Sequence, residues 1–177
     1  MLRPMGRAWE LAQVNYSRLL APLESPLLAD FVAGLEPVNA VADTAPGFVW
    51  RLQTDDGNAT AIRGFEWDAG GSAGVIVNMS VWTDLASLAE FVYGNVHRAV
   101  LRRRREWFEV IDLPSTACWW VPAGQRPTVA DAEERVRHLR AHGPTPHAFT
   151  LRQHFPAPDA DDSDVPTAGE SDWLCPA

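Results

Sequence analysis

Apolar and polar residues follow a strand-like pattern in five short segments of the chain. Some of them alternate, as expected when one face of a strand is buried, and others are short apolar runs bounded by turn signals. The Asp55-Asp56-Gly57-Asn58 cluster is a strong turn signal between two of them, so these two should form a hairpin. The predicted strands are 10–15, 48–52, 59–65, 75–81 and 117–121.

Three other segments have helical spacing. Ser25-Pro26 is a typical helix start, and the apolar positions that follow it continue to Val38, with Pro37 as a possible kink or end. Thr83 can cap a second helical region, which Gly94 should bend or break. Thr128 can cap a third helix over 129–141, with acidic residues early and basic residues late.

The order of these elements predicts an α+β fold. Strand, helix, three strands, helix, strand and helix give two β-α-β units, which form a ferredoxin-like antiparallel sheet with helices on one face. The other face would then be bare and would carry Trp50, Trp119 or Trp120. Two subunits packing sheet to sheet would form a dimeric α/β barrel, so we expect a homodimer. We expect one domain over residues 1–155 and an acidic, disordered tail over 156–177.

The distribution of charge argues against nucleic acid as a partner. The formal net charge is −8, but six of the 23 acidic residues lie in the tail, which has no basic residue. Residues 1–155 contain the remaining 17 acidic residues and all 15 basic ones, which are arginines. This part of the chain is therefore nearly neutral and lacks the basic footprint of a nucleic-acid binder. The use of arginine alone is typical of a GC-rich genome and indicates a bacterial source.

Cysteine content and hydropathy indicate a cytoplasmic protein. Cys118 and Cys175 form no disulfide framework and no metal-binding spacing, which fits a reducing compartment. The chain has no signal-peptide pattern and no run of 18 apolar residues, so we expect no membrane partner.

Several motifs between Trp9 and Phe155 resemble a bacterial family known as domain of unknown function 3291. The resemblance rests on the opening at 10–15, on Pro46-Gly47-Phe48-Val49-Trp50-Arg51-Leu52 and on Asn78-Met79-Ser80-Val81-Trp82. It continues through His97, the segment 102–108 and Trp119-Trp120-Val121-Pro122-Ala123-Gly124 to His142-Gly143-Pro144. The family is similar to the dimeric α/β-barrel superfamily, which includes cofactor-free monooxygenases of antibiotic biosynthesis, cyclases, isomerases and haem enzymes. This resemblance implies a pocket between sheet and helices, but it selects no reaction.

His97 is the first candidate for chemistry. A neutral imidazole can serve as general base, general acid or axial haem ligand near physiological pH. It would share a helix face with Tyr93 and with Arg104 or Arg105. The alternative is a histidine of the core or of the dimer interface.

Polar residues in apolar strands are the next candidates. Asn78, Arg51 and Gln13 could each find a ligand as partner if they were buried, or could point to solvent. Aromatic residues could line a pocket for a planar ligand, or simply form the core. The predicted pocket residues are Trp50, Trp82, Tyr93, Trp107, Trp119 and Gln13.

Two basic clusters have simpler interpretations. Residues 102–105 are four arginines around a helix, which favours a solvated face paired with Glu106 and Glu109; one of them, Arg104, could hold a carboxylate or a haem propionate. His138 and His142 are four residues apart, followed by His147 and His154, but no carboxylate or cysteine completes a recognised ligand set, so we predict no metal site.

Together with the candidate residues, the family resemblance implies an enzyme of the monooxygenase, cyclase or isomerase type that acts on an aromatic or polyketide-like small molecule and needs no cofactor. In this hypothesis His97 removes a proton, and Asn78 and Arg51 stabilise the resulting enolate. The alternatives are a haem protein with His97 as axial ligand and Arg104 near the propionates, and a non-catalytic small-molecule binding dimer.

Overall fold

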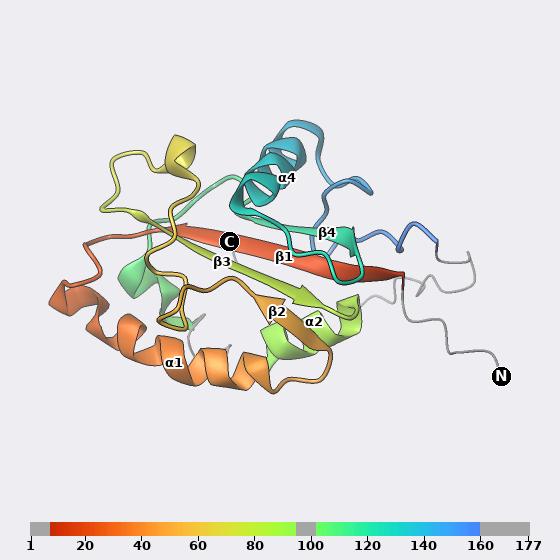
Figure 1. Cartoon of the computed structure of the whole chain (residues 1–177). Helices are drawn as coiled ribbons and strands as arrows, with labels where there is room; N and C mark the ends of the chain where they lie inside the picture. Colours follow the sequence, from red (N-terminus) through yellow and green to blue (C-terminus); the bar gives the residue numbers. More distant parts are fainter. Residues whose placement is uncertain (1–7, 95–101, 160–177) are drawn as a thin grey trace.

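A computed structural model describes residues 8–94 and 102–159 of the chain. The four strands are β1 (Trp9–Arg18), β2 (Phe48–Arg51), β3 (Val75–Trp82) and β4 (Thr116–Pro122), and they form one sheet in the order β2-β3-β1-β4 (Figure 1). Every neighbouring pair is antiparallel. This is the order of a ferredoxin-like α+β fold, and it confirms the predicted fold class.

The predicted strand at 59–65 does not form. Asn58 closes a tight turn, in which its carbonyl accepts the backbone N–H of Thr54 and its side chain accepts the N–H of Thr60. The chain then leaves the sheet, and β2 pairs with β3 instead of with a hairpin partner. The turn signal was therefore correct, but the apolar residues after it pack in a loop.

The helices begin close to the predicted positions. Ser25 caps the 3-10 turn η1 (Pro26–Leu28), which leads into α1 (Ala29–Asp43); Pro37 lies inside α1 and does not end it. The cap of α2 (Leu85–Tyr93) is Asp84 rather than Thr83, and Gly94 follows its last residue. A second 3-10 turn is η2 (Glu66–Asp68), and residues 102–107 are helical.

The helix α4 (Val129–His142) has the predicted cap. Thr128 and Asp131 form a complete capping box, each side chain accepting the other residue's backbone N–H. Arg140 and His142 in the last turn complement the helix dipole.

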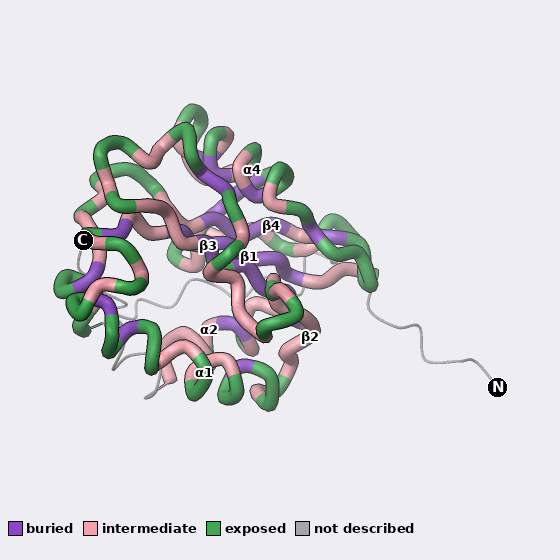
Figure 2. The backbone as a smooth tube through the Cα atoms, turned by 60° about the vertical axis from the view of Figure 1, so that its left-hand side comes forward, coloured by how far each residue is buried: buried purple, intermediate pink, exposed green. Residues whose placement is uncertain are grey.

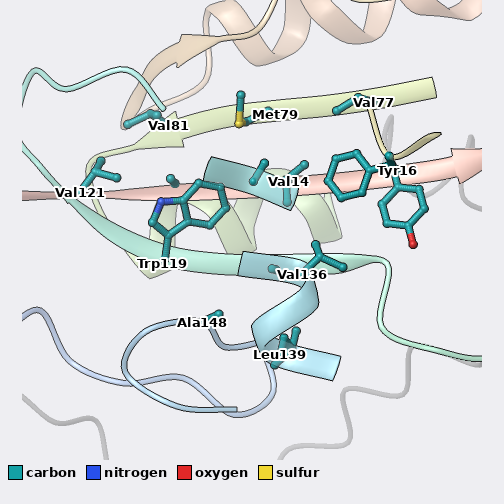
Figure 3. Packing of buried hydrophobic residues seen from close by; sticks show 14 residues of the cluster. Val14, Tyr16, Val77, Met79, Val81, Trp119, Val121, Val136, Leu139 and Ala148 are labelled. Atoms are coloured by element: carbon teal, nitrogen blue, oxygen red, sulfur yellow. The ribbon is translucent and has the colours of Figure 1, made fainter. Parts of the chain in front are cut away.

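Helices cover both faces of the sheet. The ferredoxin-like helices α1 and α2 lie on one face, and α4 lies on the other (Figure 1). The bare aromatic face is therefore not found, because Val136 and Leu139 of α4 belong to the same buried cluster as Trp119 of β4 (Figure 3). Trp119 is only 2% exposed, and Arg135 of α4 places its guanidinium 6.0 Å from the centre of the indole ring.

The buried residues concentrate in the sheet and along the inner side of α4, whereas α1 is largely exposed (Figure 2). On the α4 side, alternate residues of β1, β3 and β4 form the main core: Ala12, Val14, Tyr16, Val77, Met79, Val81, Ala117, Trp119 and Val121. Phe65, from the loop before η2, stacks on Tyr16 with ring centres 4.2 Å apart and closes this core at one end.

An ionic network joins β1, η2 and α4. The carboxylate of Asp68 lies 2.7 Å from Arg18 and 3.0 Å from Arg140, and it accepts the hydroxyl of Tyr16. Burial and the bond to Asp68 raise the pKa of the Tyr16 hydroxyl well above its usual range. Both arginines and the tyrosine therefore fix one carboxylate between three elements.

Within the two described ranges, no helix combines the length and the apolar character needed to cross a membrane.

Candidate functional site

A cavity of about 470 Å³ lies between the sheet and α1, on the face opposite α4. The strands β1 and β3 form its floor, α1 one wall, and residues 104–111 another. Its apolar lining consists mainly of Phe31, Leu35, Val38, Leu52, Ile76, Phe108, Val110 and Ile111. Its polar lining includes Asn15, Ser17, Asn39, Arg51, Asn58, Thr60, Asn78, Arg104, Arg105, Glu109, Ser115 and Thr116.

Two asparagines lie side by side on the cavity floor. Asn15 of β1 and Asn78 of β3 are direct partners across the antiparallel pair, so their side chains leave the same face of the sheet. Neither carboxamide hydrogen-bonds to another residue in 8–94 or 102–159. Asn78 is exposed although it lies in the middle of a central strand, which is where an apolar residue is expected. The floor thus offers two adjacent amide groups to whatever fills the cavity.

Arg51 lies at the edge of the cavity and is held there by the protein. Its Nε and Nη2 donate to the two carboxylate oxygens of Asp43 at 2.7 and 3.1 Å, and Nη1 donates to the carbonyl of Gly57 at 2.8 Å. The ion pair fixes the guanidinium and offsets its charge, so Arg51 can orient a ligand better than it can supply net positive charge.

The wall formed by residues 104–111 carries most of the remaining charge. Arg104, Arg105 and Glu109 line the cavity there, and Glu109 approaches Arg18 at 4.0 Å. Arg103 points elsewhere and pairs with Glu106 and with Asp30 of α1, each at 2.8 Å. The arginine run is therefore divided between a surface ion-pair cluster and the cavity.

The predicted aromatic pocket residues lie outside the lining of this cavity. Trp82 and Trp119 are fully buried in separate clusters, Trp107 packs on Phe31 beneath η1, and Trp50 faces the α4 side of the sheet. Tyr93 ends α2.

Gln13 is on the cavity face of the sheet but is already paired. Its Oε1 accepts the hydroxyl of Ser80 at 3.3 Å, and that hydroxyl accepts the indole N–H of Trp82 at 2.8 Å. A bound ligand is not needed to satisfy these buried polar groups.

His97 lies outside the described residues, so its relation to the cavity stays a prediction. Of the other predicted site residues, the fold brings Asn78, Arg51 and Arg104 to one cavity. Sequence reasoning missed Asn15, although strand alternation already placed it on the same face as Gln13. It also missed Phe31 and Leu35, which looked like ordinary core positions of a helix.

Comparison with known proteins gives a family and distant structural similarities. The model of the family described as "Domain of unknown function (DUF3291)" matches residues 10–165. No curated protein matches the chain.

Among solved structures, the chain is similar to the NE2512 protein of unknown function from Nitrosomonas europaea, with 15% identity over 70% of this chain and 99% of that one and a TM-score of 0.42. It is also similar to SnoaB, a cofactor-independent oxygenase from Streptomyces nogalater, with 18% identity over 66% and 95% of the two chains and a TM-score of 0.40. A mutant of that oxygenase gives 17% identity, the same coverage and a TM-score of 0.39. Similarity at this level does not transfer a reaction.

Proposed function

We propose an enzymatic function for this chain, which belongs to the family described as domain of unknown function 3291. The proposed reaction is the removal of a proton from a small aromatic or polyketide-like ketone that binds in the cavity between β1, β3 and α1. The observation that supports this most directly is the pair Asn15 and Asn78. Their carboxamides line the cavity floor side by side and bond to no other residue in the described ranges.

The lining supports a flat, largely apolar substrate. Phe31, Leu35 and Val38 of α1 face Ile76 of β3 across the cavity, so a ring system can lie between helix and sheet. Polar groups are grouped on the floor and at the edges, where a carbonyl or hydroxyl group of the substrate would meet them.

The proposed step is a proton transfer. A base removes a proton from the carbon next to the substrate carbonyl, the electron pair of the broken C–H bond moves to the carbonyl oxygen, and the proton remains on the base. The amide N–H groups of Asn78 and Asn15 donate to the resulting enolate oxygen, where such donors lower the barrier. The enolate can then react with dioxygen, cyclise or be reprotonated, so this step is common to a monooxygenase, a cyclase and an isomerase.

The proposed base is His97, on the sequence argument above. Glu109 is the carboxylate that lines the cavity within residues 8–94 and 102–159, and it is the base to compare with His97. Arg51, fixed by Asp43, would orient the carbonyl rather than transfer the proton.

Exchange of the acidic C–H for deuterium in D₂O tests this step without knowledge of the final product. The probe is a hydroxylated polycyclic aromatic ketone with an acidic methylene group, followed by proton NMR. We expect catalysed exchange by the wild type. His97→Ala should slow it by about 10²–10⁴-fold, the usual contribution of a general base. Asn78→Ala should slow it by about 10²–10³-fold, as for loss of one oxyanion donor.

Gln125→Ala, in the exposed turn after β4, is the control and should exchange at the wild-type rate. If Glu109→Gln rather than His97→Ala abolished exchange, the base would be Glu109. Binding of the ketone without catalysed exchange in any protein would contradict the proposal and favour a binding module. A Soret band that appears on addition of haemin and is lost in His97→Ala would favour the haem protein instead.

A further inference from the structure

We propose that Glu134, His138 and His147 form a binding site for one divalent transition-metal ion of the zinc class, on the opposite side of the sheet from the cavity. Glu134 and His138 are one helical turn apart on α4, and His147 comes from the turn that follows the helix. The proposal does not depend on the reaction proposed above.

The three side chains already lie close to the spacing that a metal requires. One ligand atom from each lies within 4.8 Å of the other two. In a tetrahedral zinc site with bonds of about 2.0–2.1 Å, ligand atoms are roughly 3.3 Å apart. Nε2 of His147 is 2.9 and 3.0 Å from the two carboxylate oxygens of Glu134, so these two need almost no movement. Small side-chain rotations would complete the set.

The backbone around His147 is well anchored. Gly143 ends α4 with a φ of 71°, and its N–H still bonds to the carbonyl of Leu139. Thr145 and Ala148 exchange two backbone hydrogen bonds, and Phe149 then pairs with Cys118 at the edge of the sheet. His147 is therefore held between a helix end and a sheet edge, which reduces the ordering cost of binding a metal.

Thr145 supports both histidines. Its hydroxyl lies 2.9 Å from Nε2 of His138 and accepts the backbone N–H of His147 at 3.3 Å. The contact with His138 is of the kind that metal-binding histidines usually have on their other ring nitrogen, where it fixes the ring orientation and the tautomer. The contact with His147 holds only the backbone of that residue.

The ligand types select the metal. Two imidazoles and one carboxylate suit zinc and its neighbours cobalt, nickel and copper, whereas calcium and magnesium prefer oxygen ligands throughout. Three protein ligands leave a fourth tetrahedral position. His142, one turn beyond His138 with ring centres 4.6 Å apart, or a water molecule can fill it.

Arg135 is the group that a metal would displace. Its Nη1 lies 2.6 Å from Nε2 of His147 and donates to the His147 carbonyl at 3.0 Å, so a positive charge already occupies the edge of the site. Its Nε makes no hydrogen bond in the part of the chain that the structure describes, but it lies 3.5 Å from a carboxylate oxygen of Glu134, so the guanidinium is next to two of the proposed ligands. Removing that charge should therefore increase metal affinity.

The test is a Zn²⁺ titration of the full chain, freed of metal with a chelator, in competition with a chromophoric zinc indicator. We expect one equivalent to bind. Glu134→Gln and His147→Ala should each weaken binding by roughly 100-fold or more, because even the partners of metal ligands contribute about 10–100-fold. Arg135→Gln should strengthen it. His154→Ala removes another histidine of the same region, whose Nδ1 lies 3.3 Å from the Leu151 carbonyl, and should leave binding unchanged.

Circular dichroism of each variant checks folding. Should a ligand variant fail to fold, the Co²⁺-loaded wild type gives an independent answer, since two or three imidazole signals should be shifted by the paramagnetic ion in its proton NMR spectrum. Absence of stoichiometric uptake by the wild type would overturn the proposal. So would wild-type affinity in both Glu134→Gln and His147→Ala, or an equal loss in His154→Ala.

Discussion

The carboxylate of Glu133 accepts the backbone N–H of Phe65, with Oε1 and N 2.5 Å apart. Phe65 has a φ of +56°, a conformation that non-glycine residues rarely adopt, and its fully buried ring stacks on Tyr16 of β1. One hydrogen bond from α4 thus fixes the loop that follows β2 in the conformation that fills the end of the core.

Removing this acceptor should destabilise the fold. Glu133→Ala leaves the N–H of Phe65 without a partner in a largely buried position, which should cost about 1–3 kcal/mol of unfolding free energy. Glu133→Gln keeps an acceptor oxygen and loses only the ion pair with the half-exposed Arg137, so it should cost less than about 1 kcal/mol. Urea denaturation at pH 7 measures both, and equal losses would show that the ion pair matters instead.

Asp68 should make the fold sensitive to acid. Burial alone would raise the pKa of its carboxyl, but hydrogen bonds from Arg140, Tyr16 and Arg18 outweigh burial and lower it to about 2. Because the pKa of Asp68 is lower in the folded protein than in the unfolded chain, the ionised carboxylate stabilises the fold. This contribution to the unfolding free energy is complete above about pH 4 and is lost as the pH falls toward 2. It amounts to roughly 2 kcal/mol at neutral pH.

Asp68→Asn should therefore be less stable than the wild type at pH 7, and the difference should shrink below pH 4. Urea titrations over this pH range measure it. Asp30→Asn removes an exposed carboxylate that pairs with Arg103, and should change stability little at any pH. A gap between wild type and Asp68→Asn that stayed constant down to pH 2 would contradict the assignment.

Gly47 should tolerate no side chain. A Cβ at this position would lie 2.2 Å from Oγ of Ser87 and 2.6 Å from Oγ1 of Thr83, where α2 begins. Gly57 has the same φ of 77° and open space around it. In both alanine variants the left-handed backbone should lower the free energy of unfolding by about 1–2 kcal/mol. Gly47→Ala should lose about 1–3 kcal/mol more because of the clash. Thermal denaturation of the two proteins isolates that difference.

Cys118 should be inert to thiol reagents in the folded protein. Its side chain is completely buried in β4, and burial raises the pKa of the thiol to about 12. In a Cys175→Ser variant, where Cys118 is the remaining cysteine, a chromogenic disulfide reagent should react only in denaturant. Fast reaction without denaturant would mean that β4 opens readily at its edge.

The sequence alone was sufficient for the elements whose signals are local. The Thr128 cap and the apolar run in 75–81 each depend on neighbouring residues, and both elements form where they were predicted. The segment 59–65 has the composition of a strand, but it does not pair in the sheet, and the backbone N–H of Phe65 bonds instead to Glu133, which is far away in sequence.

The candidate site was predicted only in part for the same reason. Asn78 and Arg51 were recognised as polar residues in apolar strands, and both line the cavity. The aromatic residues were harder, because a tryptophan looks the same in sequence whether it lines a pocket or fills a core. Trp119 fills the core because α4 folds over it, and a contact between segments distant in sequence cannot be predicted from a local pattern.

Glu134 illustrates the converse case. Its spacing from His138 was visible in the sequence, but an acidic residue near a helix start has a sufficient explanation in the helix dipole. The turn after the helix brings His147 next to Glu134, so that this carboxylate lies beside a second histidine in addition to His138.

The position of α4 also determines how the chain can fold. A protein whose sheet is covered on one face only by the sheet of a partner subunit completes its core only when it associates. The melting temperature of such a protein rises with protein concentration. Here Val14, Met79 and Trp119 on that face are covered by residues of their own chain. This half of the core should consequently form in a unimolecular reaction, at a rate and a midpoint that do not change on dilution, and whatever assembly the protein undergoes would be a later and separable event.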